Sequence, residues 1–376
     1  MRRFNTTGPC IPGKHYMVDL TERLSQIQEL VGEGAYFTIN YARQYGKTTT
    51  IAELVKRLSE KYLVISLDFQ RFSDACFENE KSFCNTFASA FVREVRLRQA
   101  EAAEAAPQTE RLTAAKQEAD FNLMHMFEIL KEFCECSAKP VVLIIDEVDY
   151  ASNNRVLLDF LSQLRYGYLD REVREFVFFQ SVILAAVYDV RNVRRKIRPS
   201  EHNVNSPWNI AADFDVDMGL SKEGIAGMLK EYDEDHATGM DTQEMAAMLY
   251  DYTSGYPFLV SRLCQLIDEK VQEKEEIGGR LTAWTKKGFH EAVRLILLEE
   301  NTLFGSMIGK LVDYSELNAM LGSLLFAGEN TVYNPDNLAI SDAVMFGFVK
   351  NQQGNVAISN RIFEARLYNY YLSTAE

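Results

Sequence analysis

The stretch Asn40–Thr50, NYARQYGKTTT, constrains the fold of this chain more than any other, because it contains Gly46-Lys47-Thr48. Tyr36 to Ile39 before it predicts a short buried strand, and Thr48 to Tyr62 after it has apolar residues at helical spacing. Strand, loop and helix in this order place backbone N–H groups at a helix N-terminus, where they face an anion. The pattern predicts a phosphate-binding loop, although Tyr41 stands where the usual G-x-x-x-x-G-K-[ST] pattern has its first glycine.

Three residues at the end of this loop would provide its chemistry. Gly46 lets the backbone approach a phosphate closely. Lys47 would neutralise the charge of the β- and γ-phosphates, which makes it a catalytic as well as a binding residue, and the Thr48 hydroxyl would ligate Mg²⁺. The glycine missing at Tyr41 matters less, because that position only eases the entry turn. A Gly-Lys-Thr triplet also occurs by chance, but the strand and helix around this one favour a nucleotide site.

A second motif supports the first. Val141 to Ile145 is a continuous apolar run followed by Asp146 and Glu147, as expected of a central parallel strand with a carboxylate tip. In P-loop NTPases this is the Walker B motif, in which Asp146 would hold Mg²⁺ through water and Glu147 would orient or deprotonate the attacking water. The alternative, that these acids merely cap the next helix, suits Asp149 better than Asp146. Because two independent motifs stand in the required order, the sequence predicts a nucleotide site with Glu147 as a catalytic residue.

The loop resembles that of a particular group of P-loop proteins, the AAA-like and STAND-type ATPases, which include archaeal ATPase-like and bacterial AAA-ATPase-like proteins. These often have the pattern P-R-Q/R-x-G-K-[ST], and Ala42 to Thr48 matches it apart from Ala42 in the place of the proline. The resemblance implies ATP and Mg²⁺ as cofactors, and it implies that the entry segment around His15 to Asp19 wraps the adenine. The nucleotide-binding residues implied in this way are Arg43, Gln44, Tyr45, Gly46, Lys47, Thr48 and Thr49 in the loop, and Tyr16, Met17 and Val18 in the entry segment.

Two later segments extend the resemblance. Ser181 to Val187 predicts another central strand, and Asp189 after it falls where such ATPases place a polar sensor-1 group, a catalytic residue near the γ-phosphate. An ordinary strand-to-loop turn explains Asp189 equally well. Thr253 to Pro257 resembles the STAND signature GxP, in which Pro257 opens a lid helix against the nucleotide. No sensor-2 arginine is visible, which fits STAND proteins better than AAA+ proteins.

The order of these segments predicts an α/β fold with three parts. A P-loop NTPase core with a central parallel sheet, including a strand at Leu63 to Asp68, is expected over residues 1–219. Apolar stripes predict an α-helical lid over residues 220–300, and the methionines and tyrosines in these stripes are expected to be core packing. Residues 301–376, helices followed by a hairpin, predict a winged-helix-like domain. Inside the core, residues 96–118 have little apolar periodicity, so we expect an exposed helical insertion broken at Pro107.

Charge limits the partners. The chain of 376 residues has a formal net charge of −14, which argues against broad electrostatic binding to nucleic acid. Residues 301–376 have four basic and seven acidic side chains, so this part lacks the charge that DNA binding needs. Five basic residues instead crowd positions 191–198, as a solvated loop or as a trans-acting arginine or polyanion contact. DNA is left as a partner only through this run, beside a protein partner or further copies of the chain.

Composition favours a cytoplasmic location. No run of about eighteen or more apolar residues occurs, so we expect no membrane span, and the N-terminus lacks the apolar stretch of a signal peptide. The six cysteines are scattered, which suits reduced thiols in a cytosol.

Three functions are compatible with these features. The first is an ATP-hydrolysing molecular switch, in which nucleotide state moves the lid and the winged helix against the core. The second is a nucleotide-bound scaffold or regulator that does not hydrolyse, and the third is an accessory factor of a mobile-element or defence system. Acids at positions 147 and 189 favour hydrolysis. The sequence does not separate ATP from GTP firmly, although no N-K-x-D guanine signature occurs.

Overall fold

The computed structural model describes residues 2–151, 154–187, 208–326 and 331–374. The chain divides into two compact units. Unit 1 comprises Met1–Glu22, Tyr41–Thr49 and Asp217–Glu376, and unit 2 comprises Arg23–Asn40 and Thr50–Val216.

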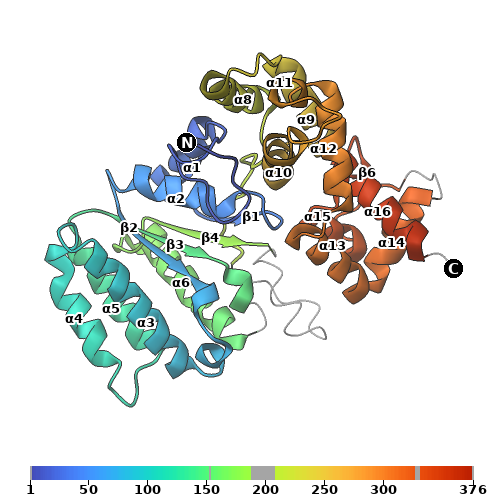
Figure 1. Ribbon diagram of the computed structural model, residues 1–376. Coiled ribbons are helices and arrows are strands. Elements are labelled where there is room, and N and C mark those ends of the chain that lie inside the picture. The colour runs from blue at the N-terminus through green and yellow to red at the C-terminus, as the bar shows by residue number, and fades with distance from the viewer. Residues whose placement is uncertain (1, 152–153, 188–207, 327–330, 375–376) are drawn as a thin grey trace. The chain divides into compact units, whose positions relative to one another are not determined.

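Unit 2 is built on a four-stranded parallel sheet in the order β1-β4-β3-β2 (Figure 1). Every residue of β3 and β4 is buried, as a strand covered on both faces requires. All four strands were predicted from apolar runs, so the expected α/β fold with a central parallel sheet is confirmed. The strands are β1 (Tyr36–Asn40), β2 (Leu63–Asp68), β3 (Val141–Asp146) and β4 (Ser181–Ala186).

Helices cover both faces of this sheet. The chain crosses the sheet from β1 to β2, and then returns from β2 to β3 and from β3 to β4 in the opposite direction. Because crossover connections are right-handed, the helix of the first connection and the helices of the two later connections cover opposite faces of the sheet. The core between the sheet and the second group of helices is rich in phenylalanine, with Phe69, Phe83, Phe87 and Phe160 in mutual ring contact. The helices are α1 (Thr21–Gly32), α2 (Lys47–Leu58), α3 (Glu80–Leu97), α4 (Ala106–Ala115), α5 (Leu123–Cys136) and α6 (Arg155–Arg174), with short 3₁₀ turns η1 (Phe69–Arg71), η2 (Asp74–Phe77), η3 (Ala103–Ala105) and η4 (Val148–Ala151).

The segment 96–118 corrects one expectation. Most of its residues are exposed, but Ala105, Leu112 and Ala115 belong to the phenylalanine-rich core, so one face of the segment is packed. Pro107 does not break a helix but stands in the first turn of α4, where its missing N–H is no loss. The packed face was not expected, because alanines can be buried against neighbouring helices without the spaced large apolar residues that mark a helix face.

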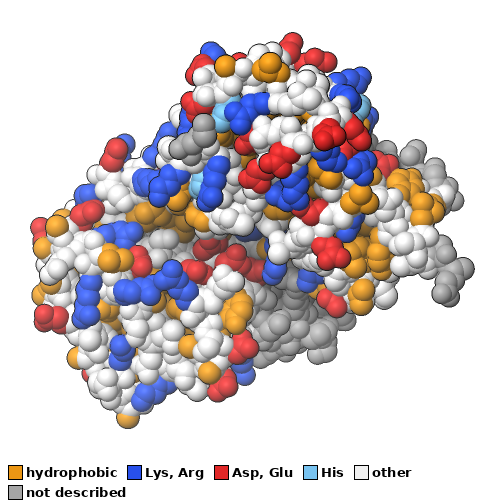
Figure 2. All heavy atoms as spheres, viewed as in Figure 1, with side chains coloured by type: hydrophobic (Ala, Val, Ile, Leu, Met, Phe, Trp, Pro, Cys, Tyr) orange, Lys and Arg blue, Asp and Glu red, His pale blue; other side chains and the backbone are white. Residues whose placement is uncertain are grey.

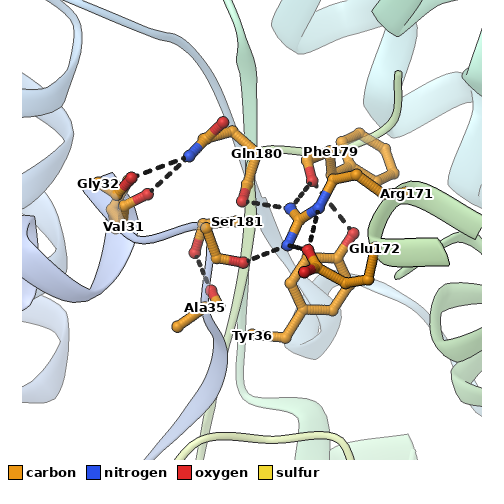
Figure 3. A network of polar contacts seen from close by, with 10 residues as sticks. Val31, Gly32, Ala35, Tyr36, Arg171, Glu172, Phe179, Gln180 and Ser181 are labelled. Carbon is orange, nitrogen blue, oxygen red and sulfur yellow. Dashed lines mark hydrogen bonds and ion pairs between the residues drawn. The ribbon is translucent and has the colours of Figure 1, made fainter. Parts of the chain in front are cut away.

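Arg171 links the segments that lead into strands β1 and β4, at the end of the sheet where these strands begin (Figure 3). Its guanidinium donates to the carbonyl oxygens of Phe179, Gln180 and Gly34 at 2.7, 2.6 and 2.6 Å. The cation also lies 5.4 Å from the centre of the Tyr36 ring. Arg171 therefore joins the end of α6 to the starts of β4 and β1. The acids that end β3 lie at the other end of the strands.

Unit 1 is mostly helical. The apolar stripes predicted for its first helices are core packing, since Ile225, Met228, Leu229 and Tyr232 are buried. Its elements are α8 (Lys222–His236), α9 (Thr242–Thr253), α10 (Pro257–Leu266), the π-helical turn η6 (Ile267–Val271), α11 (Arg280–Ala283), α12 (Lys286–Leu298), α13 (Thr302–Asp313), α14 (Ser315–Phe326), α15 (Leu338–Met345), β5 (Val349–Gln352), β6 (Asn355–Ile358) and α16 (Arg361–Thr374).

The last part of unit 1 contains the hairpin expected from the sequence. Strands β5 and β6 pair antiparallel, with Lys350 opposite Ala357. Helices α13, α14 and α15 precede the hairpin and α16 follows it.

Charged side chains are spread over both units. On the face that Figure 2 shows, basic and acidic groups are interspersed, with hydrophobic side chains between them. Glu291 on α12 accepts hydrogen bonds from Arg294 and Lys274, which lower the pKa of its carboxyl to about 2.

Among the described residues, no helix is both long enough and apolar enough to cross a membrane.

Candidate functional site

The phosphate-loop candidate, residues 41–49, follows β1 directly and ends in the first turn of α2. Gln44 and Gly46 have left-handed backbone, with φ of 58° and 82°. The backbone N–H groups of Gln44 and Gly46 donate to no other described residue. Alternation of left- and right-handed backbone turns successive N–H groups toward one point, which is how loops bind anions. Glycine at position 46 is the residue that adopts this conformation at least cost.

Lys47 is buried within the loop that it belongs to. Its ammonium donates to the carbonyl oxygens of Tyr41 and Ala42, at 2.7 and 3.2 Å. These contacts hold the cation against the backbone of the same loop. A positive charge and unpaired donors at a helix N-terminus together favour a polyphosphate.

The two threonines after Lys47 differ in their surroundings. Thr48 is an exposed residue. The Thr49 hydroxyl accepts a hydrogen bond from the backbone N–H of Cys10, at 3.0 Å. The N-terminal segment of unit 1 therefore fixes Thr49, a predicted nucleotide contact, at the start of α2.

The segment Gly255-Tyr256-Pro257 lies against the loop within unit 1. The buried Tyr256 hydroxyl donates to the carbonyl oxygen of Arg43, and the rings of Tyr256 and Tyr45 are 4.7 Å apart. Pro257 begins α10, and its Cγ is the nearest neighbour, at 3.9 Å, of the position that a Cβ would take on Gly46. Pro257 therefore lies next to the loop and begins a helix. The sequence analysis expected a proline at the start of a lid helix at this position.

The C-terminal part of unit 1 also reaches the loop, which the sequence did not predict. The Gln44 side-chain amide donates to the Thr302 hydroxyl at 2.9 Å, at the start of α13. Gly347, in the turn before β5, has no room for a side chain, because a Cβ there would lie 2.8 Å from the Cβ of Ala42. No local pattern marks Thr302 or Gly347, since their relation to the loop depends on how distant helices pack.

Two of the three entry-segment residues, Tyr16 and Val18, are packed within unit 1. Tyr16 is buried and its hydroxyl donates to the Asp235 carboxylate at 2.7 Å. Val18 is buried against Gly224 on α8. The side chains of Tyr16 and Val18 are therefore packed onto α8, and contact of Tyr16, Met17 and Val18 with an adenine stays a prediction.

The acids of the second motif end strand β3 in unit 2. Asp146 is buried and its carboxylate accepts from the backbone N–H of Glu147 at 2.9 Å. Glu147 has left-handed backbone, with φ of 54°, so the chain turns sharply between the strand and η4. Asp68, the last residue of β2, is in register with Asp146. The sequence analysis did not select Asp68 as a site residue, although a carboxylate directly after an apolar run was the available signal.

Buried oxygen atoms without a partner lie at several of these positions. The side-chain oxygens Oδ1 of Asn40, Oε1 of Gln44 and Oδ1 of Asp149 are buried and accept no hydrogen bond from a described residue. Such atoms call for water, an ion or a ligand, because burial without a partner is costly.

Oxygen donors of the kind that Mg²⁺ takes are present in each of the two predicted motifs. No group of three or more His, Cys, Asp or Glu within the described ranges is arranged as a metal site by itself. Mg²⁺ does not need one, since it is usually bound by one or two protein oxygens together with phosphates and water. Oxygen donors of the required kind are the Thr48 hydroxyl and the Asp146 carboxylate.

Two predicted features lie outside the described residues. They are Asp189 and the basic run at 191–198. Strand β4, which precedes them, is confirmed.

A family model and a solved structure match this chain over most of its length. A family model for AAA-like domains matches residues 14–370. The Walker-type ATPase PABY2304 of Pyrococcus abyssi is similar over 97% of this chain and 99% of its own, with a TM-score of 0.63 and 11% identity, which shows a shared fold. The ORC2 protein of Aeropyrum pernix has a TM-score of 0.45 and 15% identity, over 94% of each chain. The RuvB branch migration motor of Thermotoga maritima has a TM-score of 0.44 and 11% identity, over 95% and 94%. No curated protein matches the sequence.

Proposed function

Because the chain belongs to the family of AAA-like domains, we propose that it binds ATP with Mg²⁺ and hydrolyses the nucleotide, as a switch whose lid and C-terminal helices respond to the nucleotide. Membership confirms the family resemblance at the level of AAA-like proteins. The STAND character, the division at residues 219 and 300 and the winged-helix nature of the last part remain proposals. The observation that most supports the function is the loop itself, with left-handed Gly46, the ammonium of Lys47 and the start of α2.

Each polar residue of the loop has a role in binding. The N–H groups of Gln44 and Gly46 would donate to phosphate oxygens, and Lys47 would exchange its bonds to Tyr41 and Ala42 for bonds to the β- and γ-phosphates. This exchange leaves the ammonium satisfied in both states, so a buried cation is never without partners.

Asp146 and Glu147 have different proposed roles, in Mg²⁺ binding and in activation of the attacking water. Thr48 and Asp146 would hold Mg²⁺, Asp146 through water. When bound, the metal ion neutralises charge on the phosphate oxygens. Glu147 would accept a proton from the attacking water, and its own backbone N–H already orients the carboxylate of Asp146. Asp189 is proposed as a sensor near the γ-phosphate.

The switch is supported by contacts within unit 1. The loop is bonded to Tyr256 before α10 and to Thr302 at the start of α13. A ligand that favours one loop conformation therefore biases both helices, provided that it binds the two arrangements with different affinity. Charge gives the C-terminal part a packing or regulatory role instead of DNA binding, and any DNA contact is assigned to the run at 191–198.

Lysine substitutions test the nucleotide site. Lys47→Ala should weaken binding of a fluorescent ATP analogue by about a hundredfold or more, because two or more charge-assisted hydrogen bonds are lost. The matched control is Lys56→Ala on the same helix, since Lys56 is exposed and pairs only with Glu53 among the described residues. Equal affinity of the Lys47 variant and the wild type would refute a Walker loop.

Substitution of the acids separates binding from hydrolysis. Glu147→Gln should keep ATP and Mg²⁺ binding while slowing phosphate release by roughly 10²–10⁴-fold, the usual loss when a general base is removed. Asp146→Asn should instead weaken binding that depends on Mg²⁺. A wild type that binds ATP but never releases phosphate would replace the switch by the non-hydrolysing scaffold.

A further inference from the structure

A groove lies between α5 and α6 in unit 2, and no residue of the proposed nucleotide site lines it. The cavity has a volume of about 500 Å³. Its wall includes the segment 176–178, which follows α6 and contains no helix, turn or bend. Phe178 forms its floor: it packs so closely on Gly167 of α6 that a Cβ at position 167 would overlap its ring.

Several exposed apolar side chains line this groove. Met124 and Tyr166 line it with 65% and 58% of their surface exposed, and Phe176 and Val177 are exposed as well. Val173 on α6 is exposed next to them in the sequence. Contiguous apolar side chains on a protein surface mark an interaction site, because water contact with them is unfavourable.

The charged side chains at the rim of the groove form a pattern that would complement the same pattern on a second copy of the chain. Glu128 precedes Lys131 on α5, and Asp170 precedes Arg174 on α6. Both helices lead into parallel strands that follow them in the chain, so both run antiparallel to the sheet and parallel to each other. Along both walls the acid therefore precedes the base, and the four lining charges cancel.

We propose that this groove is a self-association face, on which two copies of the chain pack about a two-fold axis. A two-fold axis perpendicular to the helices reverses their direction in the second copy. The acidic end of each wall then faces the basic end of the other copy's wall, so all four charges gain opposite partners. The apolar side chains supply the free energy of association, and the charges set the register.

Ion pairs of exposed side chains contribute little stability, so the rim groups can exchange the contacts within one copy for partners in the second copy. The ion pairs from Lys131 to Glu135 and from Arg174 to Asp170 are long, at 4.0 and 3.5 Å. The Lys131 ammonium also lies 3.7 Å from the centre of the Phe176 ring, which places the cation over the wall of the groove. The backbone of Phe176 has no hydrogen bond to any described residue, so it can pair with the same segment of the second copy.

Sedimentation of the full chain over a range of concentrations tests the proposal. The wild type should show a reversible monomer–dimer equilibrium, and Met124→Glu should abolish it. Lys131→Glu should raise the dimer dissociation constant by about tenfold, because the two-fold axis introduces the like-charge contact twice. The double variant Glu128→Lys with Lys131→Glu should restore much of the affinity, since it reverses the pattern in both copies.

A charge change elsewhere is the control. Lys61→Glu, at an exposed position after α2, alters the net charge equally and should leave the dissociation constant unchanged. A wild type that stays monomeric at every concentration would overturn the proposal, and so would a dimer insensitive to Met124→Glu. Failure of ATP binding would not affect the result, because the groove contains no residue of that site.

Discussion

Arg171 is expected to contribute a large part of the stability of unit 2. Arg171→Met removes three hydrogen bonds to backbone carbonyls from a guanidinium that is mostly buried. The Phe179 carbonyl keeps the bond from the Tyr36 hydroxyl, so two carbonyls, those of Gly34 and Gln180, lose the partner that Arg171 supplies. At about 1.5–2 kcal/mol for each such bond, the free energy of unfolding should fall by about 3–4 kcal/mol.

Two further variants refine this prediction. Arg171→Lys should cost about half as much, because a single ammonium cannot reach carbonyls that a planar guanidinium joins from several directions. Arg155→Met, at an exposed position at the start of the same helix, should change stability by no more than about 0.5 kcal/mol. Urea unfolding followed by circular dichroism measures all three variants. A loss below about 1 kcal/mol for Arg171→Met would refute the view that this residue holds the edge of the sheet together.

Three other changes have expected outcomes. Gly255→Ala should destabilise unit 1 by at least about 2 kcal/mol in thermal unfolding, because φ is 73° and a Cβ would overlap the carbonyl oxygen of Leu220; an unchanged midpoint would contradict this. Tyr256→Phe should lose about 0.5–1.5 kcal/mol through the missing bond to Arg43 and weaken ATP binding several-fold, whereas equal affinity would show that this bond does not position the loop. Glu291, whose folded-state pKa is about 2, contributes stability above the unfolded pKa of about 4.3, and this is lost as pH falls toward 2. Glu291→Gln should therefore reduce the difference in stability between pH 5 and pH 2, and an identical acid profile would argue against the ion pairs.

The elements that carry the candidate nucleotide site were largely predictable from the sequence. The strand before Gly46, the helix after Lys47 and the acids at 146 and 147 stand next to one another in the chain, so local patterns contain the information. An apolar run of five residues ending in acids has few structural explanations other than a buried parallel strand. The hairpin after residue 348 was predictable for the same reason, from short alternating runs around a polar turn.

What only the tertiary structure decided is which distant residues surround these elements. Thr302 bonds to Gln44 across 258 positions of sequence, and Arg171 reaches Gly34 across 137. Burial of Ala105 and Leu112 likewise depends on helices that pack over them. Local propensity and periodicity report on neighbours within a few residues, whereas these contacts arise when separate elements bury their apolar faces together. The sequence therefore determined the chemistry of the loop and the strands, and the packing of the chain determined what holds them in place.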